Sequence, residues 1–110
     1  MPVVNFHDAL PTDWIAPGET TTVDVDGTPV AVANVEGEYY AFSNECPHQA
    51  TPLGGTPLMR TCLLQCPEHG SVFDVRTGQC VLPSDDGWSG PMTMYTTRVE
   101  EDVVQVALDR

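Results

Sequence analysis

Short strand-like runs separated by turn dipeptides fill the first half of the chain. The runs TTVDV (21–25), TPVAVANV (28–35) and EYYAFS (38–43) are rich in the β-branched and aromatic residues that favour strands. Asp26-Gly27 and Glu36-Gly37 lie between them, and a two-residue turn that ends in glycine is typical of a β-hairpin. The pattern therefore predicts consecutive antiparallel hairpins.

Strand-like runs also occupy most of the second half. They are PLMRTCLLQ (57–65), SVFDV (71–75), QCVL (79–82), MTMYTTRVE (92–100) and VVQVAL (103–108). A loop rich in Pro, Gly, Ser and Asp from Leu82 to Pro91 precedes the last two, which should form a closing hairpin. The one helical piece expected is short, around Asp8 to Trp14. With no repeats and no linker, residues 1–110 are predicted to form a single all-β domain.

The charge balance changes the set of plausible partners. The chain has four Lys and Arg residues and sixteen Asp and Glu residues, which gives a net charge of −12. Such a field repels phosphate backbones and anionic lipid surfaces, so we expect no nucleic-acid and no membrane partner, although acidity also serves solubility alone. The sequence has neither a run of eighteen apolar residues nor a start like a signal peptide. These features predict a cytoplasmic protein.

Two Cys-His pairs fall between predicted strands. Cys46-x-His48 lies in ECPHQATPLGG and Cys66-x-x-His69 in LLQCPEHG, which together supply two thiolates and two imidazoles for one metal ion or a small cluster. The single residue between Cys46 and His48 is tight for one tetrahedral zinc ion. In a two-iron cluster, each loop can give its cysteine to one iron and its histidine to the other. The short spacing suits that division.

The two motifs resemble a known pair of cluster-binding boxes. CPH in one loop, and CPEHG followed by SVF in the other, are similar to the two boxes of Rieske iron-sulfur proteins. The resemblance extends over nearly the whole chain. It implies an antiparallel β-sandwich with a small cluster-binding subdomain, formed by two loops around 44–55 and 65–73, and one 2Fe-2S cluster.

The resemblance also implies the ligands. Cys46 and Cys66 would bind the inner iron, and His48 and His69 the outer iron near the surface. A mononuclear oxygenase iron would need two further histidines, and the chain has three in all, which leaves only His7 on the first strand. The chain is therefore expected to carry electrons and not to be an enzyme itself.

The resemblance implies a function among partners. Similar proteins are soluble ferredoxins that pass single electrons from a flavin-containing ferredoxin reductase to the terminal oxygenase of a ring-hydroxylating dioxygenase. We expect a monomer with transient, partly electrostatic docking, in which Glu45 and Glu68 lie beside the ligands. Two alternatives stay open: a Rieske-type small subunit of a larger reductase, such as assimilatory nitrite reductase, and a structural zinc-binding module.

The chain departs from the high-potential respiratory members of the family. Those members have an extra cysteine in each box, joined as a disulfide, and a tyrosine that donates to a cysteine sulfur. Here Glu68 stands in the second box and Phe73 at the aromatic position. The loops must then be held by packing and backbone bonds, and a potential in the negative part of the Rieske range, about −150 to +300 mV, is expected.

Several other residues have expected roles. Ser71 is either a donor to the cluster or a turn residue. By the resemblance, Leu53 and Pro91 are expected to cover the cluster, although Leu53 could equally be an ordinary core residue. Trp88 is expected to face the core. Cys62 and Cys80 are expected to be small buried hydrophobes on strands.

Overall fold

The computed structural model describes residues 5–46, 52–68, 70–88 and 90–108. Its strands are β1 (Phe6–Pro11), β2 (Thr20–Val25), β3 (Thr28–Val35), β4 (Glu38–Ser43), β5 (Leu63–Gln65), β6 (Val72–Asp74), β7 (Cys80–Leu82), β8 (Met94–Glu100) and β9 (Val103–Ala107). A short 3-10 helix, η1 (Thr12–Trp14), follows β1. The all-β class predicted from the sequence is confirmed. Among the described residues, no helix is long and apolar enough to cross a membrane.

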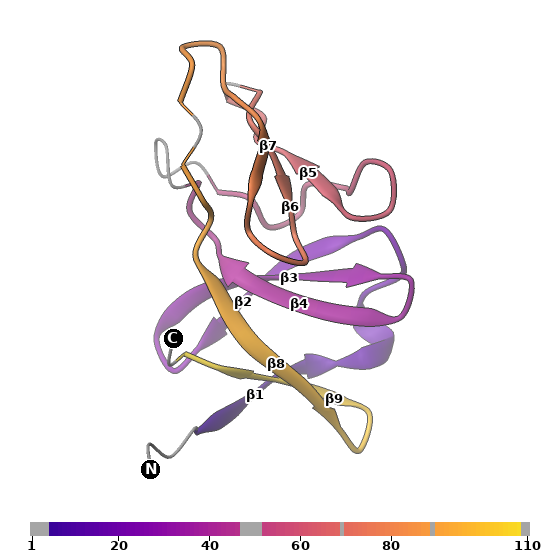
Figure 1. Cartoon of the computed structure of the whole chain (residues 1–110). Helices are drawn as coiled ribbons and strands as arrows, with labels where there is room; N and C mark the ends of the chain where they lie inside the picture. Colours follow the sequence, from indigo (N-terminus) through magenta and orange to yellow (C-terminus); the bar gives the residue numbers. More distant parts are fainter. Residues whose placement is uncertain (1–4, 47–51, 69, 89, 109–110) are drawn as a thin grey trace.

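The strands form one large and one small antiparallel sheet (Figure 1). The large sheet has the order β1-β9-β8-β4-β3-β2, and the small sheet, at one end of the molecule, has the order β5-β6-β7. Strand β8 belongs to both halves of the large sheet, because its first residues pair with β4 and its later residues with β9. The large sheet curls, so that its edge strands β1 and β2 contact each other.

Strands β3 and β4 lie between two hydrophobic cores. Their alternate side chains point to opposite faces, and Val30 and Val32 enter the core of the large sheet. Ala31 and Ala33, on the other face, enter a second core that also contains residues of the small sheet. Because the second core joins both sheets, it fixes the small sheet against the end of the large one.

The prediction of a helix around Asp8 to Trp14 is wrong for most of this segment. Strand β1 continues through Pro11, and Leu10 pairs with Val104 of β9 and is buried. This pairing satisfies the backbone groups and buries an apolar side chain, which outweighs the weak helical preference of so short a segment. Only Thr12–Trp14 is helical. His7 lies on β1, as expected.

The strand expected over residues 57–65 is shorter than predicted. Only Leu63–Gln65 forms β5, because the chain reverses between Met59 and Leu63, whose backbone groups hydrogen-bond to each other. Arg60 and Thr61 in this reversal have φ of 46° and 75°, which is the left-handed region. Cys62 therefore lies in the turn and not on a strand.

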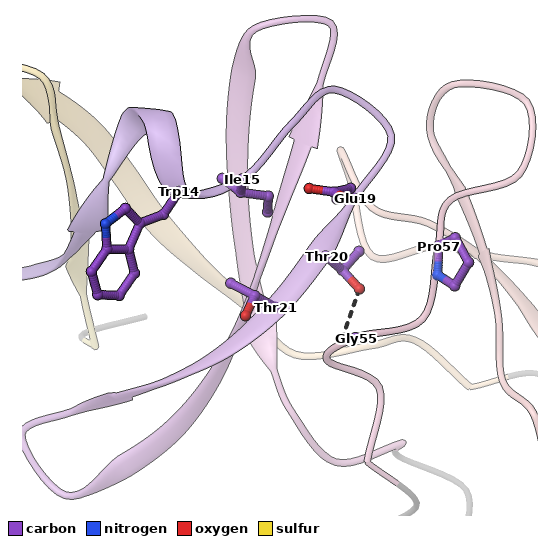
Figure 2. A pocket seen from close by; sticks show the side chains of 7 residues that line it. All are labelled: Trp14, Ile15, Glu19, Thr20, Thr21, Gly55 and Pro57. Carbon is purple, nitrogen blue, oxygen red and sulfur yellow. Dashed lines mark hydrogen bonds between the residues drawn. The ribbon is translucent and has the colours of Figure 1, made fainter.

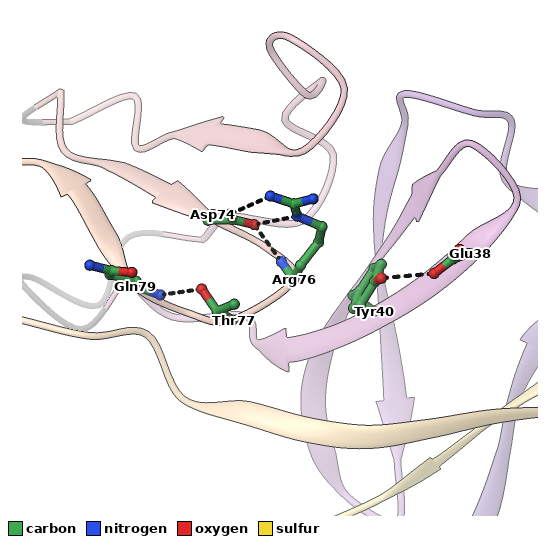
Figure 3. A network of polar contacts seen from close by, with 6 residues as sticks. All are labelled: Glu38, Tyr40, Asp74, Arg76, Thr77 and Gln79. Carbon is green, nitrogen blue, oxygen red and sulfur yellow. Dashed lines mark hydrogen bonds and ion pairs between the residues drawn. The ribbon is translucent and has the colours of Figure 1, made fainter.

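A polar network fixes the turn between β6 and β7 (Figure 3). The Arg76 guanidinium donates to both oxygens of Asp74, at 2.9 and 3.1 Å, and the Arg76 backbone N–H donates to the same carboxylate. These hydrogen bonds lower the pKa of Asp74 below its ordinary value. Beside this turn, on β4, the Tyr40 hydroxyl donates to Glu38, and this bond raises the pKa of Tyr40.

Candidate metal centre

The first Cys-His loop begins after strand β4 and returns beside its own start. Cys46, three residues after β4, is only 2% exposed. Glu45 pairs with Pro52 across the loop, and the Leu53 N–H donates to the Asn44 carbonyl at 2.7 Å. The two ends of the loop are thus bonded to each other. His48 lies outside the described residues.

The second Cys-His loop joins β5 to β6. Cys66 follows β5 directly and is also 2% exposed. The Cys66 N–H donates to Ser71 O at 2.8 Å, and the Gly70 N–H donates to Cys66 O at 3.1 Å. Backbone bonds therefore hold this loop in a tight turn, as the sequence predicted for a chain without a disulfide clamp. His69 lies outside the described residues.

The structure brings the two cysteines into one core. Cys46 and Cys66 belong to the same buried cluster, which contains Leu53, Leu64 and Phe73 as fully buried neighbours. The described residues hold no group of three or more His, Cys, Asp and Glu side chains that could bind a metal ion. The two cysteines are the described part of the predicted ligand set, and they come from loops on different sheets.

Ser71 carries an unusual polar atom. Ser71 is completely buried, and its hydroxyl oxygen has no hydrogen-bond partner among the described residues. A buried hydroxyl without a partner costs about 1–3 kcal/mol, and such a group in a native protein calls for an explanation. A hydroxyl that follows Cys66 in this tight turn has the chemistry to donate to a sulfur acceptor.

A protein-family comparison decides what these loops belong to. The Rieske [2Fe-2S] domain matches residues 5–88, which include both cysteines and the Ser71 hydroxyl. The chain belongs to the Rieske [2Fe-2S] domain family. Members of this family carry one 2Fe-2S cluster, in which two histidines replace two cysteines on one of the irons.

Several known proteins resemble this Rieske chain in both sequence and fold. It is 31% identical, over 97% of its length and 95% of the relative, to the biphenyl dioxygenase ferredoxin subunit of Pseudomonas sp. (strain KKS102). The ferredoxin of carbazole 1,9a-dioxygenase from Nocardioides aromaticivorans IC177 is 30% identical with a TM-score of 0.81, covering 94% of this chain and 97% of that one. A chain in the complex of reduced oxygenase and oxidized ferredoxin of carbazole 1,9a-dioxygenase is 28% identical, also at 0.81, with coverage of 93% and 92%.

The residues of this Rieske chain fit a 2Fe-2S cluster. Buried thiols on two converging loops, in an apolar surround, are the sulfur donors that iron-sulfur sites use. The orphan hydroxyl of Ser71 gains a partner if sulfur lies beside it. Leu53 is fully buried and belongs to the apolar surround, whereas Pro91 is exposed.

An aromatic pair in the Rieske chain joins strand β6 to the loop that follows β7. The rings of Phe73 and Trp88 are 6.2 Å apart in an edge-to-face arrangement at 62°. Trp88 is half-buried and packs against the core that contains both cysteines, which confirms the expectation that it faces inward. Gly90 lies against the indole, since a Cβ there would be 2.6 Å from the ring. The loop after β7 is thus anchored on Phe73.

Cys62 and Cys80 are separate from the two loop cysteines. Both are half-buried and pack against the edge of the shared core. Cys80 lies on β7, as expected, and its Sγ is 3.3 Å from Leu82 O. Cys62 lies in a turn. Both were expected to be small buried hydrophobes on strands, but both are only half-buried, and only Cys80 lies on a strand.

Sequence reasoning did not single out the residues that close the first loop. Thr20 on β2 is one of them, since its hydroxyl accepts from the Gly55 N–H at 3.0 Å (Figure 2) and also donates to Thr56 O at 2.5 Å. These bonds lie beside a groove whose lining is Trp14, Ile15, Glu19, Thr20, Thr21, Gly55 and Pro57. A polar strand residue next to a glycine pair gives no local signal in the sequence, because the contact joins segments far apart in the chain.

The position of Phe73 gives a prediction for the reduction potential. Phe73→Tyr adds one hydroxyl donor at the aromatic position of the second box, where a bond to a cysteine sulfur stabilises the reduced state. One such bond is worth about 1 kcal/mol, or about 40 mV for one electron, so we expect a rise of that size. Protein-film voltammetry measures it. Phe73→Leu, which adds no donor, is the control, and an equal rise in both variants would contradict the prediction.

Proposed function

We propose that this Rieske chain is a one-electron carrier for a terminal oxygenase of the ring-hydroxylating dioxygenase type. The observation that carries the proposal is that Cys46 and Cys66 share one buried core. The Ser71 residue, whose backbone carbonyl accepts from the Cys66 N–H, adds a buried hydroxyl with no partner among the described residues. We assign the cluster ligands as Cys46 and Cys66 on one iron and His48 and His69 on the other. Relatives at 30% identity and above are named as ferredoxins of dioxygenase systems.

The ligand set suits reversible transfer of single electrons. When bound, the cluster supplies a site for one electron. Two thiolates balance the charge of the oxidised cluster, and two neutral imidazoles add none, so the electron enters more readily than with four thiolates. The relatives act as electron-transfer components and not as catalysts. Only His7 remains beyond the proposed ligands, which is too few for a mononuclear oxygenase iron.

The proposed partners follow from the relatives and from charge. A ferredoxin related to this chain forms a complex with its oxygenase in carbazole 1,9a-dioxygenase. We propose transient docking of the present chain to such an oxygenase and to a flavin-containing reductase. The net charge of −12 favours partners with basic surfaces and gives fast encounters. A monomeric, cytoplasmic protein with one domain over residues 1–110 fits this role.

Exposed apolar residues on the small sheet offer a contact surface. Val81 and Leu82, on edge strand β7, are 48% and 53% exposed, and the acidic Asp85 and Asp86 follow in the next loop. Hydrogen bonds from the Ser84 N–H to Trp88 O at 2.9 Å, and from the Gly87 N–H to Ser84 O at 2.9 Å, hold that loop. An apolar patch with an acidic rim fits a partner with an apolar patch and a basic rim.

Stopped-flow mixing of the reduced protein with oxidised cytochrome c, a basic acceptor, tests the carrier function. We expect rapid transfer whose rate falls as ionic strength rises. Val81→Asn should slow transfer about fivefold, because roughly 1 kcal/mol of apolar contact is lost. Val99→Asn is the matched control, since Val99 is 47% exposed on β8 of the other sheet. Equal slowing in both variants would contradict a docking surface on β7.

The rival functions make different predictions. A permanent small subunit of a reductase would be isolated within a large complex, whereas the carrier elutes as a monomer on gel filtration. A structural zinc module would be colourless and would transfer no electron to cytochrome c.

A further inference from the structure

Asn44 is the residue on which the bonds at the base of the first loop converge. Its side-chain Oδ1 accepts from the Gly54 N–H at 2.8 Å and from the Thr22 hydroxyl at 2.8 Å. Its backbone carbonyl accepts from the Leu53 N–H at 2.7 Å. One residue thus joins the start of the loop, the end of the loop and strand β2. Cys46 lies only two positions further along the chain.

The contact at Gly54 leaves no space for a side chain. A Cβ on Gly54 would lie 1.8 Å from Thr22 Oγ1 and 2.9 Å from Asn44 Oδ1. Nonbonded heavy atoms do not approach so closely, so a side chain at position 54 would force Thr22 or the returning end of the loop to move. The close approach fits the two hydrogen bonds at Asn44 Oδ1, because Gly54 lies directly beside both Thr22 Oγ1 and Asn44 Oδ1.

We propose that Asn44 is the positioning residue of the first cluster loop. By joining both loop ends to β2, it keeps the loop closed and so fixes where Cys46 is presented. A closed base restricts the open conformations from which a ligand could leave, in the way that a short cross-link restricts a loop. The proposal rests on the proposed function, because it assigns Asn44 a role toward the bound cluster.

Asn34 provides a matched control for a purely structural role. Its side chain also makes two hydrogen bonds, donating to Ile15 O at 2.8 Å and accepting from the Gly37 N–H at 2.8 Å. It lies on β3 and is 3% exposed, so it is more buried than Asn44. If asparagine bonds matter only for global stability, replacing Asn34 should have at least as large an effect as replacing Asn44.

The experiment compares the cluster-loaded variants Asn44→Ala, Asn44→Asp and Asn34→Ala. We measure the rate at which visible absorbance is lost to an excess iron chelator, and in parallel the unfolding rate and the EPR line shape. Asn44→Ala should release the cluster about tenfold faster, as expected when one to two hydrogen bonds are lost. Asn44→Asp keeps both acceptor positions and should stay within about twofold of the wild-type rate. Asn34→Ala should speed unfolding and leave release unchanged.

Two results would overturn the proposal. If Asn44→Ala released the cluster at the wild-type rate, Asn44 would have no positioning role. If Asn34→Ala accelerated cluster release by as much as Asn44→Ala, the effect would be one of global stability alone. Thr22→Val, which removes one donor to Asn44 without changing shape, gives the same test if Asn44→Ala does not fold. Iron analysis of the wild-type protein separates the two hypotheses: absence of iron contradicts the proposed function, whereas normal loading with unchanged release contradicts only the role of Asn44.

Discussion

Replacing Cys66 by serine is expected to abolish cluster binding. Cys66 is 2% exposed and shares a buried core with Cys46, and these two residues are the only sulfur donors in the proposed ligand set. A serine hydroxyl is a harder and weaker donor to an iron-sulfur cluster than a thiolate. Iron per chain, measured on protein purified without oxygen, should fall below about a tenth of the wild-type content. The visible absorbance should be lost with it.

The other two cysteines provide the controls for this prediction. Cys62→Ser and Cys80→Ser should keep full iron content, because both residues are half-buried at the edge of the core and lie outside the two loops. Serine can still donate from position 80 to Leu82 O. Loss of iron in either control, or retention of iron in Cys66→Ser, would show that the ligands have been assigned to the wrong cysteines.

Replacing His48 or His69 by cysteine is expected to lower the reduction potential by at least about 100 mV, if a cluster assembles. An anionic thiolate in place of a neutral imidazole disfavours the added electron, as the lower potentials of all-cysteine clusters indicate. Potentiometric titration followed by EPR measures the shift. Both histidines lie outside the described residues, so this measurement tests them independently of the structure.

His7→Cys is the control for the histidine variants. His7 lies on β1 of the large sheet, and it is the one histidine that the proposed ligand set does not use. Its replacement should leave the potential unchanged. A wild-type potential in His48→Cys or His69→Cys, with the cluster present, would remove that histidine from the ligand set.

Much of the fold could be predicted from local patterns. The turn dipeptides at Asp26-Gly27 and Glu36-Gly37 separate β2, β3 and β4 as expected, because a two-residue turn sets both the length and the register of a hairpin. The cysteines of the two boxes were also expected on loops between strands. Both are there, and the structure adds that they share one buried core.

The errors come from contacts between distant segments. Residues 8–11 form a strand because β9 lies beside them, and nothing in their own sequence predicts that pairing. The strand expected over residues 57–65 is interrupted by a reversal at Arg60 and Thr61, two residues that rarely adopt left-handed backbone. The role of Asn44 depends on Thr22, on a strand that the sequence alone does not place beside the loop.

The most direct test of the account is an EPR spectrum of the dithionite-reduced protein, purified without oxygen, together with iron and zinc analysis. The account predicts a rhombic signal with an average g value below that of all-cysteine clusters, and about two irons per chain. This result would support a Rieske cluster bound by two cysteines and two histidines. A silent spectrum with one zinc per chain and no iron would contradict the account, and it would mean that the two loops hold a structural metal ion.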